Sequence, residues 1–155
     1  MARVLIVGCG CRGQSLTRAL AGGSGHAVRG TTRDPARLPA IEAAGAEAVL
    51  ADPDRLVTMM PAIEGVSVVC WLMGTAEAPG LHGPRLESML EHIVDTPARG
   101  LVYETGGAER ADARAIAARA ATTWQMPVAI LDADPAEHDA WLRAATAAVD
   151  AVLAG

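Results

Sequence analysis

An apolar run near the N-terminus leads directly into a glycine-rich turn, and this feature constrains the fold more than any other. The run is Val4–Val7, and the residues after it, Gly8–Gly13, read G-x-G-x-x-G. A helical repeat of apolar residues then begins at about Arg12. A strand, a glycine turn and a helix N-terminus in this order are the context in which the pattern binds the pyrophosphate of a dinucleotide.

Each residue type in the turn has an expected task. Gly8 is expected to make the tight turn, Gly10 to let a pyrophosphate approach the backbone, and Gly13 to let the helix pack close to the strand. Cys11 and Arg12 open the helix, where free N–H groups and the positive end of the helix dipole favour phosphate. The alternative is a glycine-rich turn that binds no ligand.

Composition excludes several classes of partner. The 155 residues carry a net charge of −5 with no basic block, and all 13 basic residues are arginine, so binding to nucleic acid through its phosphates is not expected. Nothing approaches the ~20 consecutive apolar residues that a membrane span needs. The three cysteines, Cys9, Cys11 and Cys70, and the lack of a signal peptide predict a reduced, cytoplasmic protein, with no metal site at Cys9-x-Cys11.

Strand-like and helix-like segments alternate along the whole chain. This pattern predicts a single α/β domain over residues 1–155, a doubly wound parallel sheet of about six strands in the order 3-2-1-4-5-6. The expected strands are Arg3–Val7, His26–Thr32, Glu47–Ala51, Val66–Met73, Leu101–Glu104 and Val128–Leu131. The expected helices are Arg12–Ala21, Pro35–Ala44, Leu56–Ile63, Pro84–Val94, Ala111–Trp124 and Pro135–Leu153.

Several segments occur in the order found in the extended short-chain dehydrogenases/reductases, which the chain resembles. They are Val4–Gly13, Val28–Arg33, Ala51-Asp52, Ile63–Val69 and Val128–Leu131. The resemblance implies an NAD(P)-binding domain in which Asp52, after the third strand, meets the adenine. The short glycine loop is similar to that of the atypical branch of the family.

Other parts of the chain depart from that family. Its catalytic Tyr-x-x-x-Lys is missing because the chain contains no lysine, and the single tyrosine, Tyr103, falls in the expected fifth strand. We also expect no substrate lobe after the sixth strand. Two functions therefore stay open, an NAD(P)-dependent oxidoreductase or epimerase-like enzyme of unknown substrate and a non-catalytic nucleotide-binding domain with a redox-sensing or regulatory task.

The residues after the second strand favour NADP over NAD as the cofactor. NAD sites usually place an acid there, whereas this chain has Thr32 and Arg33, a hydroxyl and a guanidinium that suit a 2′-phosphate. Arg12 is expected to add a second positive contact. Asp34 precedes a proline and resembles a helix N-cap, and Arg33 has the alternative of a solvated loop residue.

Polar residues at the ends of the later strands complete the candidate site. Asp52 is expected either to bind adenine or to cap the next helix, and Met73 and Gly74 lie beside the switch point, where Gly74 could admit a ribose or nicotinamide edge. Glu104 is a weak candidate for a general base, with a structural carboxylate as the favoured alternative. His82 falls in the loop after the fourth expected strand, where a substrate could lie, and a solvated loop residue is the favoured interpretation.

The last expected helix carries an apolar stripe that includes Trp141, Ala145 and Val149. Packing onto its own sheet is the simpler interpretation, and a homodimer contact through this helix is the alternative.

Overall fold

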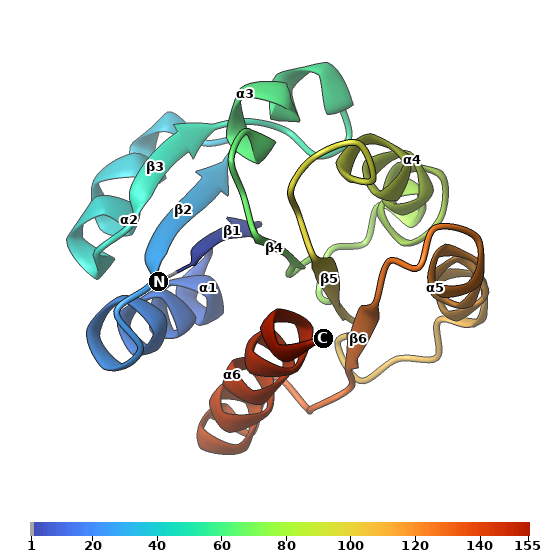
Figure 1. Cartoon of the computed structure of the whole chain (residues 1–155). Coiled ribbons are helices and arrows are strands. Elements are labelled where there is room, and N and C mark those ends of the chain that lie inside the picture. The colour runs from blue at the N-terminus through green and yellow to red at the C-terminus, as the bar shows by residue number, and fades with distance from the viewer. Residues whose placement is uncertain (1) are drawn as a thin grey trace.

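In a computed structural model that describes residues 2–155, a six-stranded parallel sheet runs through the middle of the molecule (Figure 1). Its strand order, β3-β2-β1-β4-β5-β6, confirms the predicted doubly wound topology. The strands are β1 (Arg3–Val7), β2 (Ala27–Thr32), β3 (Glu47–Leu50), β4 (Val68–Trp71), β5 (Gly100–Glu104) and β6 (Val128–Leu131).

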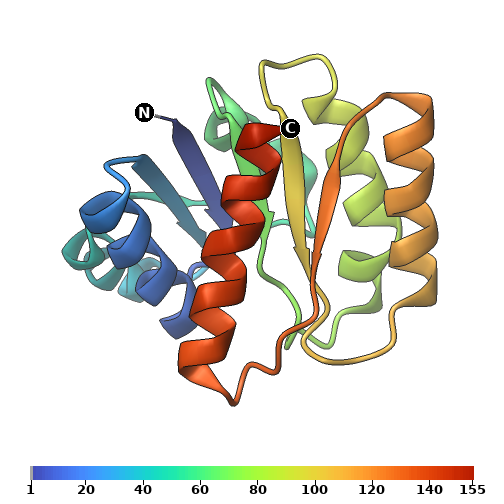
Figure 2. The same cartoon turned by 60° about the horizontal axis from the view of Figure 1, so that its bottom comes forward.

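Helices cover both faces of the sheet, with α1 and α6 on one side and α3, α4 and α5 on the other (Figures 1 and 2). The α-helices are α1 (Cys11–Arg18), α2 (Leu38–Ala44), α3 (Met60–Ile63), α4 (Pro84–Ile93), α5 (Ala111–Thr123) and α6 (His138–Ala154). The shorter or irregular turns are η1 (Ala19–Gly23), η2 (Pro35–Arg37), η3 (Leu56–Met59) and η4 (Pro79–His82).

Successive residues of β1 enter two different hydrophobic cores, one on each face of the sheet. Leu5 and Val7 pack in the core under α4 and α5, while Val4 and Ile6 pack in the core under α1 and α6. Side chains of a strand alternate between faces, so a strand covered on both sides must be apolar throughout. This explains why the run before the glycine turn has no polar residue.

The predicted segments differ from the observed ones mainly at their ends. The apolar run expected as a strand from Val66 to Met73 is a regular strand only over Val68–Trp71, although the N–H groups of Ser67 and Leu72 also donate to β1 and buried residues extend beyond the strand. The helix expected over Leu56–Ile63 is a 3₁₀ turn followed by α3, with Pro61 in the first turn of α3, where a missing N–H does no harm. The last helix begins at His138 rather than Pro135, since Asp134 closes a turn first by accepting the N–H of Ala136.

Two kinds of feature are not found in the part of the chain that the structure describes. Within residues 2–155, no helix is both long and apolar enough to cross a membrane. Over the same residues, no three His, Cys, Asp or Glu side chains gather in a way that could hold a metal ion.

Candidate functional site

The glycine loop between β1 and α1 is held in place by the end of β2. Gly8 has a φ of +80°, a left-handed backbone that favours glycine, and its N–H donates to the Thr31 hydroxyl oxygen at 3.2 Å. The next N–H, that of Cys9, donates to the Thr31 carbonyl at 2.9 Å. The turn is therefore rigidly joined to the sheet before α1 begins.

Gly10 and Gly13 lack side chains for different reasons. A Cβ on Gly13 would lie 3.1 Å from Ile6 Cγ2 and 3.2 Å from Cys9 Sγ, so this glycine allows α1 to lie close to β1. A Cβ on Gly10 would point into open space, where its nearest neighbour is Arg37 Nη1 at 3.9 Å. The space over Gly10 is thus a cradle that a side chain would fill, which fits the close approach of a pyrophosphate.

A cavity of about 700 Å³ opens beside this loop, within the range of small-molecule sites. It lies at the carboxyl ends of the strands that flank the switch point, where open α/β sheets bind their ligands. The cavity is lined by Gly8, Cys9, Gly10, Cys11, Arg12, Gly13, Thr31, Thr32, Arg33, Asp34, Arg37, Ala51, Asp52, Pro53, Asp54, Leu72, Met73, Thr75, Ala76, Glu77, Ala78 and Leu81.

Two exposed arginines, Arg33 and Arg37, line the cavity after β2. The carboxylate of Asp34 interacts with its sequence neighbours. Its Oδ1 accepts the N–H of Ala36 at 3.0 Å as an N-cap, and its Oδ2 lies 3.8 Å from Arg37 Nε. The capping role matches the sequence interpretation of Asp34. Arg37, which sequence reasoning missed, adds a second cation on the same side of the cavity.

Asp52, after β3, and Met73, after β4, also line the cavity. Asp52 is half-buried, and its Oδ1 accepts the N–H of Asp54 at 2.9 Å, so it shapes the turn after β3. The N-cap position of η3 belongs to Arg55 instead, which differs from the capping interpretation of Asp52. The sulfur of Met73 packs against Gly8, where an added Cβ would approach it to 2.5 Å.

Glu104 is the centre of a buried polar cluster beside the cavity. Its side chain is fully buried, and its two oxygens accept bonds from Arg12 Nε at 3.1 Å and Nη2 at 3.0 Å. The N–H of Gly74 donates to Oε1 and the indole N–H of Trp141 donates to Oε2, both at 2.9 Å. Glu104 does not line the cavity, and this set of partners suits a structural carboxylate better than a general base.

The same cluster changes the interpretation of Arg12 and Gly74. The guanidinium of Arg12 lines the cavity, donates to Glu104 and lies 5.6 Å from the centre of the Trp141 ring, so the position expected to contact a 2′-phosphate also carries a buried ion pair. Gly74 is buried and does not line the cavity. A Cβ there would lie 2.5 Å from the Gly106 nitrogen, so this glycine allows the loop after β5 to pack closely against the loop after β4.

His82 is buried, not solvated as the sequence suggested, because it bonds to Tyr103 across the core. Its Nε2 lies 3.3 Å from the Ala76 carbonyl, which can only accept, so Nε2 carries the proton. The neutral ring then accepts at Nδ1 from the Tyr103 hydroxyl, 2.5 Å away. Burial lowers the pKa of His82 and raises the pKa of Tyr103 to about 12, and both shifts favour this neutral pair.

A depressed histidine pKa makes stability depend on pH. The unfolded chain binds the proton more readily than the folded one, so the contribution of His82 is complete above the ordinary pKa of 6.5 and is lost as the pH falls below it. We expect the free energy of unfolding to decrease between pH 7 and 5, a range that brackets the ordinary histidine pKa. Chemical denaturation at several pH values measures this decrease.

His82→Gln is the matched variant, because a glutamine can accept from Tyr103 and donate to Ala76 without titrating. Its stability should change less steeply over the same pH range. His92→Gln, at an exposed position of α4, should keep the steep slope of the unmodified protein. Equal slopes in the unmodified protein and His82→Gln would contradict the assignment.

Sequence similarity identifies the family of the chain. Residues 8–102 match a family described as NAD(P)H-binding. The chain belongs to this NAD(P)H-binding family. The matched segment contains the glycine loop and every residue that lines the cavity, and it ends before Glu104.

Solved structures support the fold of this NAD(P)H-binding domain. The UDP-glucuronic acid 4-epimerase from Bacillus cereus in complex with NAD is 14% identical with a TM-score of 0.61, covering 83% of this chain and 54% of the epimerase. Vestitone reductase from alfalfa is 14% identical with a TM-score of 0.62, covering 84% and 56% of the two chains. Triphenylmethane reductase from Citrobacter sp., complexed with NADP(H), is 16% identical with a TM-score of 0.62, covering 83% and 48%.

These likenesses extend over about half of the length of the solved structures. At such low identity they show a shared fold, and the activities of the epimerase and reductases remain properties of those proteins. No curated protein matches the sequence of the NAD(P)H-binding chain.

Proposed function

We propose that the chain binds NADP(H) in preference to NAD(H) at the cavity beside the glycine loop. The observation that carries this proposal is the pair Arg33 and Arg37 on the cavity wall after β2, where an NAD site usually places an acid. The nearby acid, Asp34, is occupied as an N-cap and faces Arg37. Guanidinium groups recognise phosphate through charge-assisted, often bidentate hydrogen bonds.

The other cofactor contacts follow from the same cavity. Gly8, Gly10 and Cys11 would hold the pyrophosphate at the start of α1, which Gly13 allows to lie close to β1, and Thr32, beside Arg33, would contact the 2′-phosphate. Asp52 and Met73, which also line the cavity, would border the adenosine. The cofactor's nicotinamide can exchange a hydride, but the residues described here account only for binding.

Titration of the protein with NADPH and NADH tests the proposed preference. The unmodified protein should bind NADPH more tightly, and Arg33→Ala should remove most of the difference, since a lost charged hydrogen bond costs about 1.5–3 kcal/mol. Arg143→Ala, which removes the same charge from an exposed position of α6, should leave the preference intact. Equal affinity of the unmodified protein for both cofactors would rule out the proposal.

A second function, non-catalytic sensing of the nucleotide, is favoured by the hydrogen-bond partners of Glu104. This carboxylate is the acid that the sequence places at the end of a central strand, and in the fold it holds Arg12, Gly74 and Trp141 together. The chain also has no lysine to complete the Tyr-x-x-x-Lys motif of the family it resembles. An oxidoreductase would need its proton donor from another group.

Location and assembly stay predictions. The apolar stripe of α6 packs on its own sheet through Trp141, Ala145, Val149 and Val152, as the simpler interpretation expected. A homodimer through this helix would have to use its outer side, and sedimentation measurements test it. A cytoplasmic location likewise rests on the sequence alone.

A further inference from the structure

The walls of the cavity come from only one part of the sheet. In the described chain, residues 2–155, the lining begins at Gly8 and ends at Leu81, so it draws on the ends of β1, β2, β3 and β4 and the loop after β4. The ends of β5 and β6, with Glu104 and Asp132, contribute nothing to it.

A doubly wound fold is built from two mononucleotide-binding halves, and a dinucleotide lies across the crevice between them. The first half, β1 to β3, is the adenosine side, and the second half, β4 to β6, is the side of the other nucleotide. The cavity of this chain therefore provides contacts for the adenosine and the pyrophosphate, and few contacts for a group placed over β5 and β6.

The Arg12–Glu104–Trp141 cluster explains why the second half is closed. Arg12 starts from the glycine loop and reaches the end of β5, so its guanidinium crosses the crevice at the switch point. It is held there by two hydrogen bonds to Glu104 and lies over the Trp141 ring. Glu104, the last residue of β5, and Trp141 are completely buried, and neither side chain lines the cavity.

The loops after β4 and β5 also pack against each other on this side of the crevice. Gly74 and Gly106 pack backbone to backbone, since a Cβ on either would collide with the other residue. Arg110 forms hydrogen bonds to both loops. Its Nη2 donates to the Gly74 carbonyl at 3.1 Å and its Nε donates to the Thr105 carbonyl at 3.2 Å.

We propose that the site recognises NADP(H) through its 2′-phosphorylated ADP half, and that the Arg12–Glu104–Trp141 cluster denies the nicotinamide a fixed place over β5 and β6. This inference rests on the proposed function, because it concerns the same cavity. The ligand class it names is a 2′-phosphorylated adenosine diphosphate, whatever group the second phosphate carries.

Isothermal titration with three ligands tests the inference on the unmodified protein. The ligands are NADPH, 2′-phospho-ADP-ribose, which lacks only the nicotinamide, and reduced nicotinamide mononucleotide, which lacks the adenosine half. We expect the first two to bind with dissociation constants within about threefold of each other, because a group without contacts adds little affinity. Reduced nicotinamide mononucleotide should show no saturable binding.

A different order of affinities would contradict the inference. Binding of NADPH that is more than about threefold tighter than that of 2′-phospho-ADP-ribose would show that the nicotinamide is held, and would overturn the inference while leaving the proposed function intact. Failure of both ligands to bind would instead contradict the proposed function itself. In Gly10→Val, both ligands should lose affinity together, which assigns them to one site.

Discussion

A Gly10→Val protein is expected to fold normally and to lose NADPH binding by roughly 100-fold or more, about 2.7 kcal/mol. The backbone at Gly10 has a φ of −84°, outside the left-handed region that favours glycine, and a Cβ added there meets no neighbour closer than Arg37 Nη1 at 3.9 Å. It would nevertheless fill the space that the pyrophosphate needs. Thermal unfolding and NADPH titration of the same sample separate the two effects.

Gly22→Val is the matched control for this variant. A Cβ on Gly22 meets nothing within 4 Å, and the residue is exposed and lies outside the cavity, so both stability and binding should be retained. An unchanged NADPH titration of folded Gly10→Val would mean that the glycine loop serves the fold alone.

Arg12→Ala is expected to destabilise the fold by about 3 kcal/mol or more, because removal of one partner leaves the other charge buried and unpaired. Glu104 is fully buried, and without the guanidinium only Gly74 and Trp141 would still donate to it. Adding Glu104→Gln to Arg12→Ala should recover part of the loss, since the buried charge is then removed. Urea denaturation of the single and double variants measures both changes.

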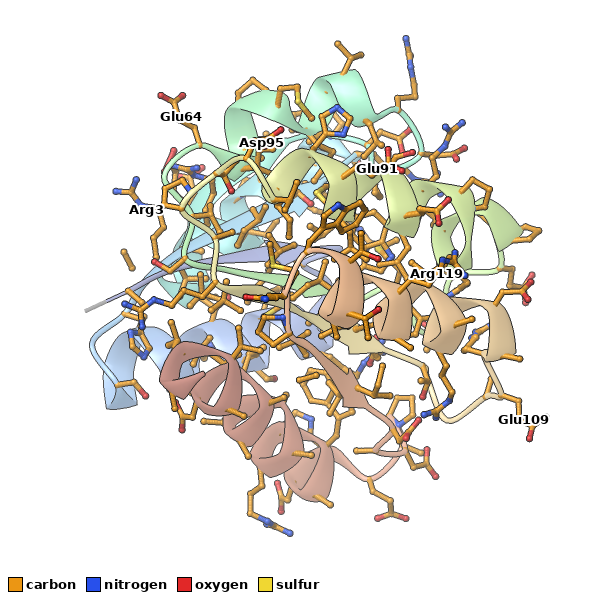
Figure 3. The ribbon with its side chains drawn as sticks, turned by 45° about the vertical axis from the view of Figure 1, so that its right-hand side comes forward. Arg3, Glu64, Glu91, Asp95, Glu109 and Arg119 are labelled. Carbon is orange, nitrogen blue, oxygen red and sulfur yellow. The ribbon has the colours of Figure 1, made fainter. Side chains whose placement is uncertain are left out.

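An exposed ion pair provides the comparison. Arg119, labelled in Figure 3, reaches from α5 to Glu87 of α4 at 2.7 Å, and both side chains are largely in water. Arg119→Ala should cost only about 0.2–1 kcal/mol, as is usual for surface pairs. If Arg12→Ala were as mild as Arg119→Ala, Glu104 would not depend on its partner in the way the structure implies.

The sheet order and the glycine loop were predictable because their signals are local. Val4–Val7 must be apolar on both faces, and Gly8, Gly10 and Gly13 follow at a fixed spacing, so neighbouring residues carry the whole pattern. The ends of the elements were less predictable. The N–H groups of Ser67 and Leu72, for example, donate to β1 although both residues lie just outside β4. Such pairing depends on which neighbours the strand meets.

The Glu104 cluster could not be derived from the sequence for a related reason. Arg12, Glu104 and Trp141 are 92 and 37 residues apart, and each has an ordinary explanation when it is taken alone. Arg12 suggested a phosphate contact, Glu104 a structural carboxylate or, more weakly, a general base, and Trp141 a packing residue. Only the crossing of α1, β5 and α6 in space shows that the three satisfy one another.

These long separations also bear on how the domain acquires its structure. Neighbouring strands in a parallel sheet are joined through crossovers, so few of its contacts form early, and closing long loops slows folding. Burial of Glu104 becomes tolerable only when α1 and α6 have both docked, from opposite ends of the chain. We therefore expect α1 and α6 to dock in one cooperative event, in which the glycine loop becomes rigid at the same moment as the last helix finds its place.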